Sequence, residues 1–425
     1  MIKKVIVSIS LLFSLAIFAQ EGTSSPYSFY GIGDIKFKGT VENRSMGGIS
    51  VFPDSIHLNL QNPAHFASLK LTSFAIGGTY ANSKSKTESQ EAKARRTTLD
   101  YLAIAIPIGK LGVGFGLIPY SSVGYKIQKI TYDINTAVTP NDTTRTVYSK
   151  YNGIGGVNKV FLGFGYKLTK KINIGADLQY NFGTIETSNL QYQIDLQYGS
   201  RENNISDLRG VNFDLGITYQ TKVKSKYSFF SALSYTPEAE LTLGNSRNIE
   251  IVQLLSTSVT VIERQNISVE DTKIKLPSKL TIGTGFGEVK KWLVGGEITF
   301  LKNSVMSNRF VDIQGTTFEN SIRYSLGGFF IPNYNSYSNY LKKIVYRGGL
   351  RYENTGLVLQ NKSINDFAAN IGLGMPLSGT FTNINIGLEI GKRGTKYYNL
   401  VEENYVNLSV GLSLSDKWFV KRKFD

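Results

Sequence analysis

Few side chains in this chain have the types and spacing that catalysis or metal binding requires. The sequence contains no cysteine, which excludes both a disulfide framework and a thiolate metal site. Its two histidines, His57 and His65, stand in no metal-binding spacing and beside no nucleophile motif. Residues 112–116 read G-x-G-x-G, but they lie in a strand pattern without a following helix to hold a phosphate. We therefore expect no enzyme activity, no cofactor and no metal.

Four carboxylates occupy polar positions of strand-like segments: Asp177, Asp214, Glu297 and Glu389. Two such groups held close together could act as a catalytic acid and base. In a barrel wall, however, they would face the interior, and we expect them to pair there with Arg323 or other cations.

The formal net charge is +15. Its basic residues are spread over separate turns and loops, not along one helix face or among stacked aromatic residues, so we expect no nucleic-acid partner. A solvated basic surface accounts for the charge, and contact with anionic lipid headgroups is the more specific alternative.

Apolar and polar side chains alternate along nearly the whole chain. In 171–182 every second residue is apolar and the residues between are mostly small and polar, and 211–220, 383–390 and 405–414 repeat the pattern. Strand side chains alternate between two faces, so each segment has one apolar and one polar face. A soluble β-sandwich, the alternative, would carry mainly Lys, Glu and Arg on its wet face. Small uncharged groups there favour the lumen of a transmembrane β-barrel.

The chain begins with a charged and then an apolar segment. Lys3 and Lys4 precede an apolar run of about 15 residues, which is too short for a membrane-spanning helix. We interpret residues 1–19 as a signal peptide cleaved after Ala19, with a membrane anchor as the alternative. No long apolar run follows, so a closed barrel is the remaining way to cross a membrane.

The period-two pattern predicts an all-β fold, a transmembrane antiparallel β-barrel of about 14 strands. Such a barrel belongs in the outer membrane of a Gram-negative-type envelope, which we take as the location. The strands are expected near 72–80, 97–107, 111–118, 157–168, 171–182, 207–220, 226–235, 279–286, 291–301, 321–330, 344–352, 366–374, 383–391 and 404–414.

The connections alternate in length, as in outer-membrane barrels with long external loops and short periplasmic turns. Gly109-Lys110 and Thr169-Lys170 are short turns of this kind. One short-side connection, 331–343, is longer, and we expect a brief helix over 338–343 with Ser338 as its N-cap. The long loops are expected at 81–96, 119–156, 183–206 and 236–278.

Aromatic pairs near the expected strand ends predict girdles at the two membrane interfaces. The pairs are Tyr180 and Phe182, Tyr227 and Phe229, Phe329 and Phe330, and Trp418 and Phe419.

Residues 20–70 precede the first strand and are too rich in glycine and proline for a barrel strand or a long helix. About 50 residues is also long for a structureless tail. We expect this segment to form an N-terminal hatch inside the lumen, with residues 71–425 as the barrel.

The hatch sequence resembles that of FadL-type outer-membrane channels. The resemblance lies in Arg44-Ser45-Met46-Gly47-Gly48, in Asp54, and in the box Asn62-Pro63-Ala64 just before the first strand. The chain is also similar to PorV-type barrels, which serve secretion, and the stretch from Ser25 to Asp34 looks like a widespread branch of such proteins. The FadL resemblance implies fourteen strands and uptake of small hydrophobic compounds.

In the family, ligand leaves sideways through a kink in the third strand. Here Pro119 follows Gly112, Gly114 and Gly116 in the third expected strand. Proline removes a hydrogen-bond donor from the sheet, so these residues are our expected lateral gate. The alternative is that Pro119 simply ends the strand. No residue matches the family's ligand-contacting positions.

Two functions are consistent with the sequence. The first is a channel for fatty-acid-like hydrophobic compounds, which predicts an apolar cavity beside Asn62–Ala64 and a wall opening near Pro119. The second is a non-transporting, PorV-like subunit of an outer-membrane secretion or assembly complex, which predicts a sealed wall and a filled lumen. The expected partners are outer-membrane lipids together with hydrophobic small molecules or other complex subunits.

Overall fold

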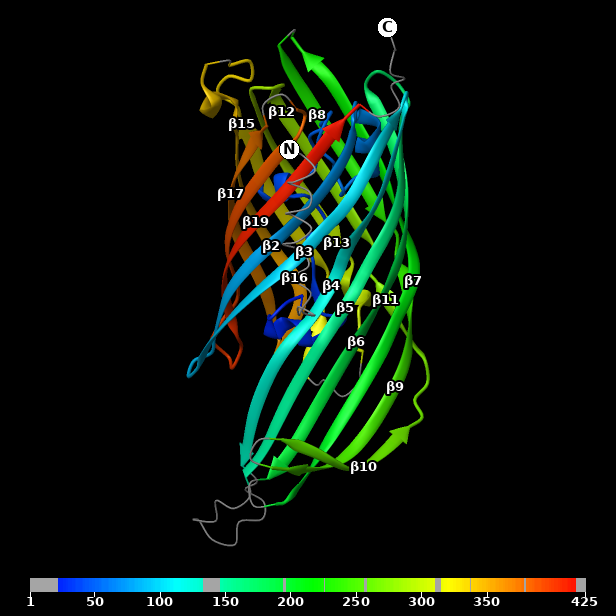
Figure 1. The fold of residues 1–425 in the computed structure, drawn as a ribbon, viewed down its shortest axis with the longest axis vertical. Coiled ribbons are helices and arrows are strands. Elements are labelled where there is room, and N and C mark those ends of the chain that lie inside the picture. The colour runs from blue at the N-terminus through cyan, green and yellow to red at the C-terminus, as the bar shows by residue number, and fades with distance from the viewer. Residues whose placement is uncertain are drawn as a thin grey trace, which may run out of the picture.

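The computed structural model describes residues 22–132, 146–193, 196–224, 226–255, 258–309, 315–336, 338–377 and 380–417. Fourteen antiparallel strands close into a barrel, which confirms the predicted fold class (Figure 1). The ring closes where β19 pairs with β2 from Asp416↔Thr72 to Glu402↔Lys86. Around the ring the strands are β2 (Thr72–Lys86), β3 (Glu91–Ile108), β4 (Leu111–Tyr132), β5 (Thr146–Lys167), β6 (Ile172–Gln193), β7 (Tyr198–Val223), β8 (Tyr227–Thr236), β12 (Lys279–Glu288), β13 (Trp292–Leu301), β15 (Ser321–Phe330), β16 (Val345–Leu359), β17 (Lys362–Pro376), β18 (Asn383–Gly394) and β19 (Glu402–Asp416).

Five further strands attach to this wall. β9 (Ala239–Leu254) pairs with the outer half of β7, and it carries β10 (Val259–Ile267) and β11 (Thr272–Leu276). β14 (Thr316–Phe318) pairs with β16, and β1 (Asp34–Ile35) pairs with β4 from inside. The short helices are η1 (Pro26–Phe29), α2 (Val41–Arg44), η2 (Pro63–Ser68), η3 (Asn303–Val305) and η4 (Tyr340–Lys343).

The two faces of the wall have the polarity that the alternation predicts. In β6, Leu178 is 57% exposed on the outside, whereas its neighbours Asp177 and Gln179 are 4% and 0% exposed. A soluble sheet would bury the apolar face and expose the polar one. The reversed arrangement is that of a transmembrane barrel with a polar lumen.

The expected long loops are shorter than the sequence pattern indicates. β2 and β3 are joined by 87–90 only, and β6 runs on to Gln193. The excursion 236–278 holds β9, β10 and β11, which the sequence analysis missed. Both faces of β10 meet water, so its polarity alternation fades while backbone pairing continues, whereas β9 and β11 bury Leu241, Leu243, Ile274 and Leu276 on one face.

The expected turns at 109–110 and 169–170 do join strands, and we call that end of the barrel the short-turn end. There the brief helix η4 begins at Tyr340 with Asn339 as its N-cap, not Ser338, because the Asn339 side chain accepts a hydrogen bond from Leu341 N at 3.0 Å. In Figure 1 this end lies at the top, and β4 to β7 extend far below the opposite rim.

Only some of the aromatic residues predicted to form girdles lie at strand ends. Tyr227 begins β8 and Phe330 ends β15, but Tyr180 and Phe182 lie mid-strand on the outer face of β6. Phe329 packs against Phe52 in the lumen instead. The predicted signal peptide, 1–19, and the pair at 418–419 lie outside the described residues.

The N-terminal segment from Gly22 to Leu71 lies inside the barrel and is coloured blue in Figure 1. Four buried clusters join it to the wall, so the apolar core of the molecule lies within the ring. In the described part of the chain, no helix has the length and apolar character to span a membrane. Apolar residues of the segment in these clusters are Tyr27, Ile32, Val41, Ile49, Phe52, Leu58, Leu60 and Phe66.

Candidate functional site

The Asn62-Pro63-Ala64 box begins η2 at the base of the luminal segment. The Asn62 side chain accepts a hydrogen bond from Ala64 N at 3.0 Å and donates one to Leu233 O at 3.1 Å. Pro63 follows at the first helical position, where no N–H is needed. The box therefore starts a short helix and also ties it to β8.

Glycines of the wall make room for η2. A Cβ on Gly175 would lie 2.4 Å from Ala64 N, and one on Gly112 would lie 2.0 Å from Phe66 O. A Cβ on Gly114 would lie 2.6 Å from the Phe66 ring. Small residues here let the backbone of the helix approach the wall closely. Gly112 and Gly114, predicted at the gate, thus form a seat for η2.

Gly47, which Gly48 follows, forms a second close contact with the wall, on the opposite side of the lumen. Their φ angles are +69° and +90°, which residues with a Cβ rarely adopt. A Cβ on Gly47 would lie 2.7 Å from Leu350 O, and wall glycine Gly349 faces the backbone of Met46 in return. The two predicted hatch motifs thus press against two different parts of the barrel.

The wall separates between β3 and β4. Their pairing ends at Leu102↔Leu117, after which β3 stays bonded to β2 while β4 continues with β5. Pro119 lies just past this point, at a bulge in the β4–β5 register. It does not end the strand, because β4 runs to Tyr132. Gly116 lies in the paired region below the separation.

The luminal segment pairs with β4 at the same place. β1 aligns Asp34 with Ser122 and Ile35 with Ser121, and Lys36 N donates to Tyr120 O at 2.9 Å. β1 therefore satisfies part of the edge that β3 leaves open. We call these paired residues, Asp34–Lys36, the latch.

A cavity of about 410 Å³ lies at the separation. Pro119, Ser121 and Gly156 line its β4–β5 side, and Thr98 and Asp100 of β3 line the other. Gly22 and Lys36 reach it from the lumen.

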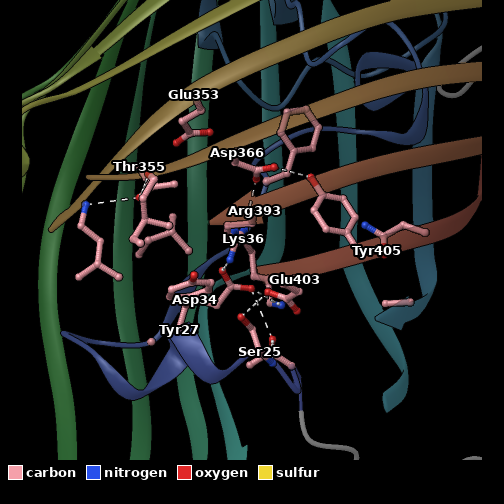
Figure 2. A pocket seen from close by; sticks show the side chains of 18 of the residues that line it. Ser25, Tyr27, Asp34, Lys36, Glu353, Thr355, Asp366, Arg393, Glu403 and Tyr405 are labelled. Atoms are coloured by element: carbon pink, nitrogen blue, oxygen red, sulfur yellow. Dashed lines mark hydrogen bonds and ion pairs between the residues drawn. The ribbon is translucent and has the colours of Figure 1, made fainter. Parts of the chain in front are cut away.

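A second cavity, of about 280 Å³, lies between the luminal segment and β16 to β19 (Figure 2). It shares Gly22, Lys36, Thr98 and Asp100 with the first, so the two cavities adjoin. Neither cavity is lined by Asn62–Ala64, where the apolar cavity of a channel was predicted. The lining of the second cavity includes many charged side chains and is therefore more polar than that prediction. The residues of the second cavity that Figure 2 labels are Ser25, Tyr27, Asp34, Lys36, Glu353, Thr355, Asp366, Arg393, Glu403 and Tyr405.

Ion pairs cross this cavity. Arg393 lies 2.8 Å from Asp34 of the latch and 3.4 Å from Asp366 of β17. Tyr405 donates a hydrogen bond to Asp366 at 2.7 Å. Burial raises the pKa of Asp34, but the guanidinium of Arg393 and the ammonium of Lys36 outweigh it and lower the pKa to about 2. Asp34 is therefore ionised at neutral pH, and the latch is held by charge.

The wall carboxylates face the lumen, and three of the four pair with cations there, as expected, although none of them pairs with Arg323. Asp177 and Asp214 both pair with Lys38 of the luminal segment. Burial lowers the pKa of Lys38, but the two carboxylates outweigh this effect and raise the pKa to about 12. Glu297 accepts a hydrogen bond from Ser50 N at 2.7 Å.

Arg323 and Glu389, the other two residues of this prediction, have their partners within the wall. Arg323 pairs with Glu353 at 2.7 Å, and Glu389 lies 3.9 Å from Arg351.

The two histidines are structural. His57 Nδ1 lies 2.8 Å from Asp54 Oδ2, and Asp54 also accepts from Ile56 N and His57 N. His65 is 2% exposed, and burial lowers its pKa to about 4, so its ring is neutral. The described residues include no group of three or more His, Cys, Asp or Glu side chains placed to hold a metal ion.

The sequence analysis missed the latch and its partners. Asp34, Lys36 and Lys38 are charged residues in a segment expected to fill a lumen. Charges in such a place require countercharges from the wall, and this was the available signal. Which wall residues supply them depends on the fold.

A family model described as BamG matches residues 1–425. No curated protein matches the chain.

Solved structures of similar fold include the toluene transporter TbuX of Ralstonia pickettii, with a TM-score of 0.58 at 14% identity over 89% of this chain and 99% of that one. The toluene transporter TodX of Pseudomonas putida has a TM-score of 0.57 at 15% identity over 91% and 100%. A FadL homologue of Pseudomonas aeruginosa has a TM-score of 0.58 at 11% identity over 90% and 98%. At these identities the similarity establishes a common fold, that of FadL-type outer-membrane barrels.

Proposed function

This chain belongs to the BamG family, and we propose that it is an outer-membrane channel that takes up small hydrophobic compounds and releases them sideways into the membrane. The observation that carries the proposal is the separation of β3 from β4 beyond Leu102↔Leu117, with a cavity of about 410 Å³ behind it. A barrel that only seals a membrane has no use for such a break, because unpaired backbone groups next to lipid are unfavourable.

The adjoining luminal cavity supplies the inner part of the route. Its charged groups form ion pairs with one another, and aromatic and apolar side chains share the lining: Tyr30, Phe37, Met306, Phe318 and Leu357. Small aromatic or fatty-acid-like molecules fit such a mixture of rings and paired charges. The proposed gate is the stretch at Pro119, with Gly116 in the paired wall below it and Gly112 and Gly114 as the seat of the hatch.

We also propose a role for each part of the chain. Residues 1–19 act as a signal peptide, residues 20–70 as a hatch with its motifs at Gly47, Gly48 and Asn62–Ala64, and residues 71–425 as the barrel. The short turns then face the periplasm. Amino-terminal sequencing of the membrane-extracted protein tests the cleavage, with Gln20 as the expected first residue.

Uptake in cells tests the channel. Cells that produce the protein should accumulate labelled toluene or a labelled long-chain fatty acid faster than cells that lack it. A small sugar serves as the control and should enter both strains equally. Equal uptake of all the apolar compounds by both strains would contradict a channel.

The second candidate function is a non-transporting, PorV-like subunit of an outer-membrane secretion or assembly complex. What favours it is the filling of the lumen, where wall glycines contact η2 and Met46 and where Lys38 pairs with Asp177 and Asp214. Purification in mild detergent distinguishes the two. Stoichiometric protein partners together with equal uptake would favour the subunit.

A further inference from the structure

Lysines cluster on three neighbouring turns at the short-turn end. The turn segments 221–227, 288–291 and 331–343 contain seven lysines and one acidic residue, Glu288. The turns are adjacent because β8 pairs with β12 and β13 pairs with β15. Ile331 N also donates to Lys291 O at 2.7 Å. The charge is therefore gathered in one place by the fold.

Glu288 neutralises only part of this charge. It lies 3.4 Å from Lys226 and 3.6 Å from Lys291. Some exposed lysines at the opposite end of the barrel are each matched by one carboxylate, such as Lys273 with Glu240 at 3.2 Å. With one carboxylate for seven lysines, the three neighbouring turns thus keep an excess of positive charge.

Two of the lysines occupy backbone positions that favour glycine or asparagine. Lys224 and Lys290 have φ angles of +49° and +66°, in two neighbouring turns. A residue with a long charged side chain at such a position is not explained by turn geometry. A need for positive charge at these turns would explain the two lysines.

Aromatic side chains lie directly beside these lysines on the outer face of the wall. The rings of Tyr227, Phe286 and Trp292 lie 5.4 to 6.3 Å apart. Lys226 lies over the Tyr227 ring, and Lys290 lies 4.7 Å from the centre of the Tyr334 ring. Such aromatic groups mark the level of lipid headgroups in a membrane. The lysines beside them are at the height of lipid phosphates, a position that favours a lipid over a protein partner.

We propose that this end of the barrel holds an anionic phospholipid, with its headgroup on a basic rim and its chains along the aromatic cluster. The basic rim consists of Lys222, Lys224, Lys226, Lys290, Lys291 and Lys342, and the aromatic cluster consists of Tyr227, Phe286 and Trp292. Lysines near an anionic surface are attracted to it over about one Debye length. The site does not depend on whether the barrel conducts a ligand.

Trp292 provides a reporter within the site. The chain has two tryptophans, so a Trp418→Phe background leaves Trp292 as the single tryptophan, whose emission is read. The full-length protein is folded into vesicles that mix phosphatidylcholine and phosphatidylglycerol, and either lipid in turn carries bromine on its chains to quench Trp292. The ratio of the two quenching curves gives the preference for the anionic lipid.

We expect phosphatidylglycerol to be preferred about fivefold for each lysine that engages its headgroup. Changing Lys222, Lys224, Lys290 and Lys342 to Gln should bring the ratio close to one. The matched control changes four exposed lysines elsewhere, Lys93, Lys129, Lys362 and Lys396, to Gln and should keep the ratio.

The migration of unheated protein on a gel checks that every variant is folded. A quenching ratio of one for the protein with its rim lysines unchanged would overturn the proposal. An equal drop of the quenching ratio in the rim variant and the control variant would overturn it as well. Retention of an acidic protein by the rim in detergent, together with a lipid ratio of one, would assign the surface to a protein partner instead.

Discussion

The Asp34 carboxylate lies 2.8 Å from the guanidinium of Arg393, a residue of β18. Asp34 belongs to the latch that pairs with β4 at the separation of the wall. One ion pair therefore connects the luminal cavity to the opening beside Pro119. Any movement of the latch must break this pair or carry it along.

Loss of Arg393 should weaken the barrel. The Arg393→Gln substitution removes one countercharge from both Asp34 and Asp366, which keep Lys36 at 3.5 Å and Arg351 at 3.4 Å, respectively, and we expect it to lower the free energy of unfolding by about 1–3 kcal/mol. Urea unfolding in vesicles measures this. Lys392→Gln is the matched control, because Lys392 is 56% exposed on the same strand and pairs with Glu402 at the surface. Its effect should stay within about 0.5 kcal/mol, and equal effects of the two substitutions would contradict the role given to Arg393.

The seat of η2 should not tolerate a side chain. In Gly175→Ala the added Cβ meets Ala64 N at 2.4 Å, so the helix must shift, and we expect a loss of about 1–3 kcal/mol. Gly348→Ala is the control, since its nearest neighbour would lie at 3.9 Å. Unfolding midpoints compare the two variants. Equal stability of both would mean that η2 does not depend on this close contact.

A covalent latch should stop uptake if the channel works as proposed. Ile35 and Ser121 are direct partners in the β1–β4 pair, which places their Cα atoms within the usual range for a disulfide. The chain has no cysteine of its own, so the Ile35→Cys, Ser121→Cys pair is the single disulfide that can form.

We expect uptake by the oxidised variant to fall to the level of cells without the protein and to return on reduction. The two single-cysteine variants control for the substitutions themselves. Uptake that is the same in both redox states would show that the latch need not move.

The contact between His57 and Asp54 should make stability depend on pH. Burial lowers the pKa of His57, but the carboxylate of Asp54 and, at 3.9 Å, that of Glu42 raise it above the ordinary value, against an opposing effect of Arg347. A raised pKa means that protonated His57 stabilises the fold. This contribution is complete below about pH 6.5 and is lost as the pH rises through the raised pKa.

The measurement is the difference in unfolding free energy between the protein and its His57→Gln variant across this pH range. It should shrink with rising pH. A difference that is constant from acid to alkaline pH would contradict the assignment. The pKa of Asp54 is lowered, so its own contribution is lost only in strong acid.

Much of the wall was predictable from the sequence, and the reason is local. At membrane depth lipid lies on one side and the lumen on the other, so every second side chain changes polarity, as at Leu178 and Gln179. All fourteen expected segments correspond to wall strands. β10 was missed because water on both of its faces removes that signal, whereas β9 and β11 bury one face against the luminal segment.

The sequence by itself determined the polarity of each face, the number of wall strands and the presence of a glycine-rich segment before them. The tertiary structure alone decided that Gly112 and Gly114 seat η2, that Pro119 borders an opening, and that Asp34 pairs with Arg393. Alternation is a property of neighbours along the chain, whereas these contacts join residues up to 359 positions apart. Such residues meet only once the ring has closed around its own N-terminal segment.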